Sequence, residues 1–336
     1  MAARNGRGAA ADPGARTRTA RGWVRALTAS VRHVWRGVGQ RPVLVVLIGA
    51  VAIAFSGILF RLSHVSASTG AFYRCVFALP PLWLLARRET RHYGRPPRRA
   101  VRLACLAGAF FAADLILWHN GIEQVGAGLA TVLGNTQVVL VGLLAWGILG
   151  ERPQRSALAA IPIVGFGVLL ISGVLESGAY GSNPGLGVLY GLLTGLAYSG
   201  FLLVLREGSR DLRRPAGPLF TATLASAIGC AAIGAVVGDL DLTPSWAAIG
   251  WLILLALSSQ VLGWLLISTS LPRLPAVTTS ILLTFQPVCS VIFAALIVDE
   301  NPSGLQLAGA ACILAGLVTA TLGRRQAPAP EPELAG

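Results

Sequence analysis

Long apolar runs recur along this 336-residue chain from residue 43 almost to its end. Each run has roughly 19 to 25 residues, and at about 1.5 Å per residue a helix of that length crosses a hydrocarbon core of about 30 Å. Charged residues make up only 12% of the chain and hydrophobic residues 54%, so too few charges are present to cover a globular surface. The sequence therefore predicts an all-α polytopic membrane protein.

We expect ten transmembrane helices. Their predicted spans are residues 43–61, 67–86, 101–120, 124–148, 156–175, 185–205, 216–238, 246–268, 275–298 and 304–323.

The distribution of basic residues predicts the orientation of these spans. All 27 basic residues are arginines, and 25 of them fall on one side if the amino terminus is cytoplasmic. The other two are Arg61, at the outer end of the first span, and Arg74, inside the second. Short loops rich in arginine are retained on the cytoplasmic side of the membrane. We therefore expect a multi-pass protein of the cell membrane with both termini in the cytoplasm.

Two stretches of the chain, 149 positions apart, are similar to each other: LGNTQVVLVGLLAWGILGERP at 133–153 and LLTFQPVCSVIFAALIVDENP at 282–302. Each places one glutamine, Gln137 or Gln286, in an apolar run and ends in Glu-x-Pro, at Glu151 or Glu300. Because each half has an odd number of spans, the halves have opposite orientations. We predict an inverted repeat of five plus five spans, over residues 42–175 and 185–323.

This architecture resembles the EamA-type branch of the drug/metabolite transporter superfamily. The resemblance covers residues 43–323 and includes an apolar fourth span that ends in Glu-x-Pro, followed by a Gly-rich fifth span. The segment SASTGAFYRCVFAL at 66–79 resembles the family's second span, with Arg74 at its recurrent arginine, whereas 215–228 has no such arginine. The resemblance implies a secondary transporter, and many members export amino acids or related metabolites.

Gln137 and Gln286 are predicted to lie near the bilayer midplane, where the inverted halves would bring them to face each other. An amide both donates and accepts hydrogen bonds, so the pair could bind a zwitterionic or polar substrate. Asn135 and Thr284 occupy equivalent positions beside them. The alternative role is interhelical hydrogen bonding, worth about 1 kcal/mol per contact. We also place Tyr198 and Trp264 on the wall of a substrate pathway formed by spans 6 and 8.

Arg74 and Asp114 are the only charged residues well inside the predicted spans. Each costs about 2.5 to 3.5 kcal/mol to insert unless it is paired or hydrated. Their similar depth predicts a structural ion pair. The alternative hypothesis is that Asp114 takes up a proton during transport and frees Arg74 for a substrate carboxylate.

Other polar residues are assigned structural roles. We expect His119 to be an exposed imidazole at the membrane interface. Glu151 and Glu300 are predicted to help begin the helices that follow them. Gly187, Gly191 and Gly195 form a stripe that permits close helix packing.

The first 41 residues are rich in Arg, Ala and Gly, and we interpret them as a retained cytoplasmic extension, although a transit peptide has similar chemistry. Part of this extension is amphipathic and could lie on an anionic membrane surface, and a solvated basic tail fits equally well. Residues 324–336 form a short cytoplasmic tail.

The composition also limits the chemistry. The chain has no lysine, which excludes a Walker-type P-loop and a lysine Schiff base, so transport energy would come from a gradient or another subunit. The five cysteines lie in apolar runs and are predicted to be unpaired. We expect no catalytic residue, cofactor, metal or nucleic acid partner. The expected partners are a small-molecule substrate and the lipid bilayer, and a homodimer stays open. The alternative functions are an intramembrane enzyme and a flippase for lipid-linked substrates.

Overall fold

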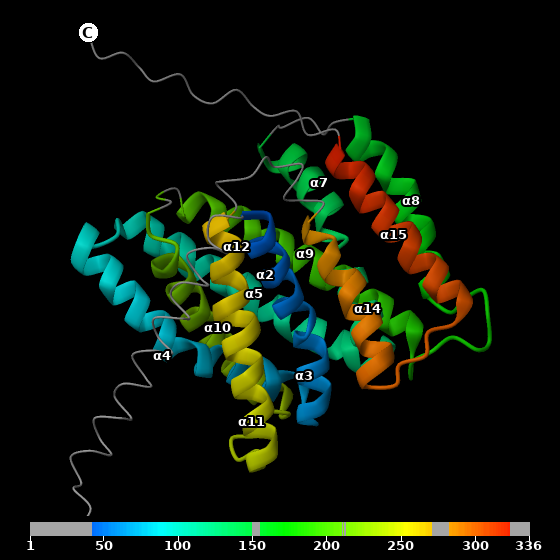
Figure 1. Ribbon diagram of the computed structural model, residues 1–336, viewed down its shortest axis with the longest axis horizontal. Helices are drawn as coiled ribbons and strands as arrows, with labels where there is room; N and C mark the ends of the chain where they lie inside the picture. Colours follow the sequence, from blue (N-terminus) through cyan, green and yellow to red (C-terminus); the bar gives the residue numbers. More distant parts are fainter. Residues whose placement is uncertain (1–41, 150–154, 210, 212, 271–281, 323–336) are drawn as a thin grey trace, which may run out of the picture.

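The computed structural model describes residues 42–149, 155–209, 211, 213–270 and 282–322, and within these ranges the protein is helical and contains no strand (Figure 1). The helices in chain order are α2 (Pro42–Ala54), α3 (Ser56–Ser63), α4 (Ala67–Tyr93), α5 (Arg98–Val125), α6 (Ala127–Gly134), α7 (Gln137–Leu149), α8 (Arg155–Ile171), α9 (Pro184–Gly208), α10 (Ala216–Val237), α11 (Trp246–Leu255), the π-helix η1 (Ala256–Gly263), α12 (Trp264–Ser270), α14 (Phe285–Ile297) and α15 (Gly304–Leu322).

Length and composition make six segments of the described chain candidates for crossing a membrane. They are Pro42–Ser63, Ala67–Tyr93, Arg98–Val125, Pro184–Leu205, Ala216–Val237 and Trp246–Ile267. Four further apolar helices are shorter: Ala127–Leu140, Arg155–Ile171, Phe285–Ile297 and Gly304–Ala320. The all-helical membrane fold is confirmed, and the count of ten spans stays a prediction.

Small residues let several helix pairs approach closely. α8 and α15 lie side by side in Figure 1, and a Cβ atom added at Gly167 of α8 would lie 2.6 Å from the carbonyl oxygen of Gly309 in α15. The three glycines of α9 permit close packing, as expected: Gly187 lies against Val125, Gly191 against Leu133 and Gly195 against Thr136. These close contacts hold helices together where lipid supplies no hydrophobic driving force.

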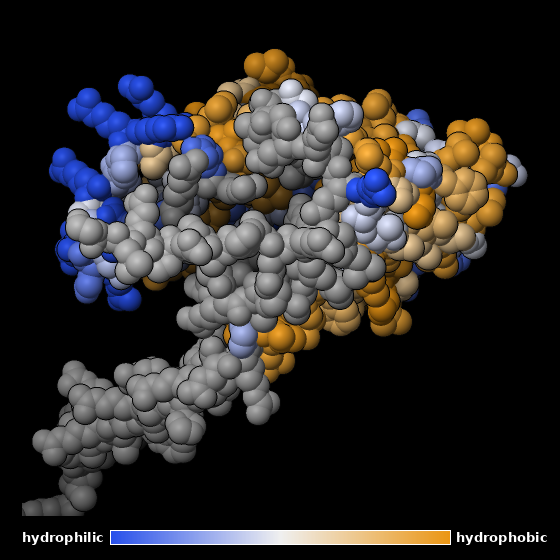
Figure 2. Space-filling model, turned by 90° about the horizontal axis from the view of Figure 1, so that it is seen from above, coloured by the Kyte–Doolittle hydropathy of each residue, from blue (hydrophilic) through white to orange (hydrophobic). Residues whose placement is uncertain are grey.

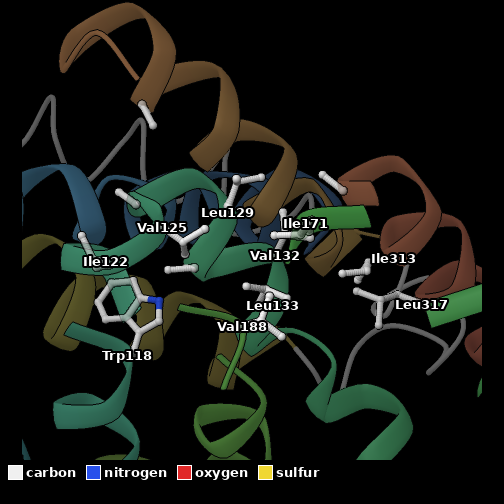
Figure 3. Packing of buried hydrophobic residues seen from close by; sticks show 14 of the residues in the cluster. Trp118, Ile122, Val125, Leu129, Val132, Leu133, Ile171, Val188, Ile313 and Leu317 are labelled. Carbon is white, nitrogen blue, oxygen red and sulfur yellow. The ribbon is translucent and has the colours of Figure 1, made fainter. Parts of the chain in front are cut away.

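The largest hydrophobic cluster surrounds α6. Every residue of this short helix is buried, and Figure 3 shows its side chains between those of α5, α8, α9 and α15. The labelled members of the cluster are Trp118, Ile122, Val125, Leu129, Val132, Leu133, Ile171, Val188, Ile313 and Leu317. α6 is thus a central element of the fold, although it is too short to span a bilayer alone.

The described surface is largely apolar. Figure 2 shows hydrophobic residues over most of the described surface in view and hydrophilic residues on the side where α4 lies in Figure 1. Large apolar side chains such as Phe166 in α8 and Leu196 in α9 are exposed, as expected of helices that face lipid. The five cysteines are free, as predicted.

The structure corrects the role expected of Glu300. This residue does not cap α15, the helix that follows it. Its carboxylate accepts hydrogen bonds from the backbone N–H groups of Ala127 and Gly128, at 2.7 and 3.1 Å, and so caps α6 of the other half of the chain. The reason is the packing of α14 against α6, which brings the segment after α14 to the start of α6. The counterpart Glu151, the extension 1–41 and the tail 324–336 lie outside the described residues.

Candidate functional site

The two glutamines singled out by the repeat both lie at breaks in apolar helices. α6 ends at Gly134, the chain turns at Asn135 and Thr136, and α7 begins at Gln137. In the second half the chain turns at Thr284, and α14 begins one residue before Gln286. Transporter substrate sites are commonly formed by discontinuous helices of this kind. The breaks, which periodicity did not predict, place the expected site residues where backbone groups leave the helical pattern.

The first break is held by local hydrogen bonds and by α9. The amide of Asn135 donates to the carbonyl of Thr131 at 2.8 Å, and the hydroxyl of Thr136 donates to that of Leu133 at 2.7 Å. The hydroxyl of Ser199 in α9 donates to the carbonyl of Gln137 at 3.3 Å. The side chain of Asn135 therefore satisfies its own helix end in this conformation.

The second break borders a cavity of about 460 Å³ between α14 and α15. Thr284 lines it together with Val288, Leu314, Ala315, Val318 and Thr319. Gln137 and Gln286 are both half-buried, and within the described ranges neither side-chain amide forms a hydrogen bond. Their binding role stays a prediction.

Arg74 lies in a buried polar cluster formed by three helical segments. Its side chain, on α4, is only 4% exposed. Nε donates to Oε1 of Gln260 at 3.2 Å, and Nη2 lies 3.4 Å from the hydroxyl of Ser259. Nε2 of Gln260 in turn donates to the hydroxyl of Thr223 in α10 at 3.3 Å. Among the described residues the guanidinium group thus has only neutral acceptors, and it lies 5.7 Å from the centre of the Trp118 ring.

The π-helix η1 supplies two of these partners. Ser259 and Gln260 are consecutive residues of Ala256–Gly263, and both side chains contact Arg74. π-helical segments are rare and occur often at functional sites. This feature was not predicted from the sequence, because no hydrophobic period distinguishes a π-helix from an α-helix. The available signal was Gln260 itself, a polar residue in an apolar span.

The expected direct ion pair between Arg74 and Asp114 is not formed in this conformation. Arg74 turns toward η1 and uses Gln260 and Ser259 as acceptors. Asp114, on α5, is 7% exposed and, among the residues that the structure describes, makes no hydrogen bond or ion pair. The two groups are still near enough to interact electrostatically.

Tyr198 and Trp264 lie in one aromatic cluster, and their expected place on the wall of a substrate pathway stays a prediction. Their ring centres lie 6.2 Å apart at an angle of 74°, and both rings contact Phe201. Phe201 is fully buried, so the two aromatics belong to a packed cluster in this conformation. The cluster also includes Cys75, the residue next to Arg74.

The expectation for His119 was wrong. The imidazole is fully buried and stacks on Phe60, with ring centres 3.9 Å apart. Its Nδ1 lies 3.1 Å from the carbonyl oxygen of Ala67, and its Nε2 has no hydrogen-bond partner among the described residues. α3 and α4 pack against the end of α5 and cover the ring. The position of His119 along its span could not reveal this burial.

Comparison with known proteins gives one family and one fold. The profile of the EamA-like transporter family matches residues 40–173 and again residues 185–322. A solved structure described as "Crystal structure of protein" superposes with a TM-score of 0.57 and 15% sequence identity, covering 84% of this chain and 97% of the other. At that identity the likeness extends to the fold alone. No curated protein matches the chain.

Proposed function

The chain belongs to the EamA-like transporter family, and on that premise we propose that it is a secondary active transporter that exports amino acids or related small polar metabolites by alternating access. The family match favours transport over the intramembrane enzyme and the flippase. The observation that carries the choice of substrate class is the buried Arg74, which among the described residues has only neutral hydrogen-bond partners and lies near Asp114, itself without a partner in those ranges.

Two inverted five-helix repeats, residues 42–175 and 185–323, would form the transporter. The double match of one family profile supports this arrangement. The packing supports it too, because two pairs of helices at equivalent positions contact each other: α4 with α10, and α8 with α15. Pairing between equivalent elements is what a pseudo-twofold axis produces.

The protein would lie in the cell membrane with both termini in the cytoplasm. Arginines near the α4–α5 and α9–α10 connections support this orientation, since they gather at the same end of the bundle. Arg99 pairs with Glu207 at 3.3 Å, and Arg214 donates to backbone carbonyls of Tyr93 and Gly94. Arginine-rich loops remain on the cytoplasmic side.

Substrate binding would use the cluster around Arg74 and the two helix breaks. A guanidinium group recognises a carboxylate through paired hydrogen bonds, and within the described part of the chain the one at Arg74 is hydrogen-bonded only to Gln260 and Ser259. The amides of Gln137 and Gln286, with Asn135 and Thr284 beside them, would contact the polar remainder of the solute. Asp114, which makes no hydrogen bond or ion pair among the described residues, would carry the coupling proton, since acidic groups within transmembrane helices commonly serve as proton relays.

A metabolite-panel efflux assay in an overexpressing strain tests this proposal. Expression of the protein is expected to raise the efflux of at least one carboxylate-bearing solute. Arg74→Gln should lower that efflux about tenfold or more, because a hydrogen bond to a charged group contributes about 1.5 to 3 kcal/mol. Arg88→Gln, an exposed position on the same helix, is the matched control and should leave efflux unchanged.

The possible outcomes separate the claims. A panel in which no solute changes would contradict transport itself. Equal efflux by Arg74→Gln and Arg88→Gln would contradict the carboxylate site. Normal transport by both Gln137→Ala and Gln286→Ala would remove only the glutamines from the site.

A further inference from the structure

Glu300 joins three separate parts of the chain at one end of the bundle. Its Oε1 lies 2.5 Å from Nη1 of Arg61 in α3 and accepts the N–H of Ala127, while Oε2 accepts the N–H of Gly128. Nη1 of Arg61 also donates to the hydroxyl of Tyr180 at 3.2 Å. We name this group, Arg61, Ala127, Gly128 and Glu300, the Glu300 latch.

The latch is closed and well protected. The side chain of Glu300 is 1% exposed and that of Arg61 35% exposed, so water reaches the cation but not the anion. Gly126 makes room for the carboxylate: it has a φ of +88°, and a Cβ atom there would lie 2.7 Å from Oε2 of Glu300. Charge-assisted bonds from a helix amino terminus and an arginine are strong in such a buried setting.

The latch connects the two halves of the chain. Arg61 and α6 belong to the first half, and Glu300 follows α14 of the second half. α6 leads from the latch to the helix break before Gln137, and α14 leads from the break at Thr284 to the latch. Any motion that parts the two halves at this end must release Glu300 from both Arg61 and α6.

A cavity lies next to the latch. It has a volume of about 490 Å³, and its lining includes Arg61, His64, Glu123, Gly126 and Tyr180. In the proposed orientation this end of the bundle faces the exterior, because the arginine-rich connections lie at the other end. The latch therefore stands between an outer vestibule and the helix breaks.

We propose that the Glu300 latch is the external gate of the transporter, closed in this structure and opened when Glu300 leaves the amino terminus of α6. This inference rests on the proposed function for the direction of the pathway. The gate residues are Glu300, which makes the contacts, and Arg61, which holds the carboxylate in position. Because Glu300 caps α6, its release also frees the helix that precedes the first break.

Thiol labelling from outside the cell tests the gate. Thr131 is 4% exposed and lies one turn below Ala127 on α6, so Thr131→Cys in a background without the native cysteines reports access past the latch. Glu300→Gln is expected to raise the labelling rate by a membrane-impermeant thiol reagent about tenfold or more. Arg61→Gln should give a smaller rise and Arg61→Lys the smallest, because lysine keeps the charge.

Glu89→Gln is the matched control for this experiment. Glu89 accepts the N–H groups of Ala216 and Gly217 at 2.9 and 2.7 Å, so it caps α10 as Glu300 caps α6, but at the arginine-rich end. Its replacement should leave external labelling of Thr131→Cys unchanged. Equal labelling in Glu89→Gln and Glu300→Gln would overturn the proposal.

A second pair of variants keeps every charge. Gly126→Ala pushes a methyl group against the Glu300 carboxylate, whereas Gly238→Ala imposes similar backbone strain, at a φ of +82°, with nothing within 4 Å. Gly126→Ala should raise the labelling rate and Gly238→Ala should not. No rise in either Gly126→Ala or Glu300→Gln, with both proteins monodisperse in detergent, would overturn the gate.

The labelling and efflux experiments distinguish a failure of the gate from a failure of the proposed function. A positive labelling result without efflux of any solute would overturn the proposed function and, with it, the assignment of the moving contact as a transport gate. Measurable efflux with unchanged labelling would overturn the gate alone.

Discussion

At the scale of single residues, the buried charges were the predictable part of the site and their partners were not. Arg74 and Asp114 stand out in any apolar sequence because a charge inside a span is costly. The ion pair inferred from their similar depth is absent, since depth along a helix says nothing of the direction in which a side chain points. The acceptors of Arg74 come from η1, whose π-helical register no periodicity reveals.

Gln260 is predicted to stabilise the protein by satisfying Arg74. Gln260→Leu leaves a buried guanidinium group without its Nε acceptor and should lower the free energy of unfolding by about 2 kcal/mol. Thr223→Val removes only the neutral hydrogen bond from Gln260, so a smaller loss, about 1 kcal/mol, is expected. Thermal unfolding of both purified variants in detergent gives the comparison. Equal losses would show that Gln260 contributes little through Arg74.

At the scale of helices, the apolar runs located every described element, but not where the elements break. The fourth span was expected as one helix over 124–148 and is divided into α6 and α7. The local cause is visible only in three dimensions, where Asn135 and Thr136 turn their side chains back to carbonyls of α6. Helix propensity does not predict this competition, because Asn and Thr also occur inside transmembrane helices.

The crossing of α8 and α15 is predicted to tolerate no side chain at Gly167. A Cβ atom there would lie 2.6 Å from the carbonyl oxygen of Gly309 and 3.0 Å from the backbone nitrogen of Ile313, so Gly167→Leu must separate the helices. A loss of stability of about 2 kcal/mol is expected from overpacking. Gly165→Leu is the control on the same helix, since nothing lies within 4 Å of its Cβ position. Similar unfolding temperatures for the two variants would show that the crossing adjusts without cost.

At the scale of the whole molecule, the repeat carried the most information about organisation. The offset of 149 pairs Glu300 with Glu151 and Arg61 with Arg210 in the sequence. The structure shows what the glutamate does at one end, where it caps a helix of the opposite half. From the sequence, that carboxylate was expected to help begin the helix following it, because contacts between halves cannot be inferred from spacing within one half.

The orientation of the whole bundle leads to a labelling prediction for two exposed connections. Gly178, between α8 and α9, has nothing within 4 Å of its Cβ position, and Arg95, between α4 and α5, is exposed. In a background without native cysteines, Gly178→Cys should react with a membrane-impermeant reagent on intact cells. Arg95→Cys should react only after the cells are opened, because arginine-rich connections stay in the cytoplasm. The reverse pattern would place the Glu300 latch on the inside and make it a cytoplasmic contact.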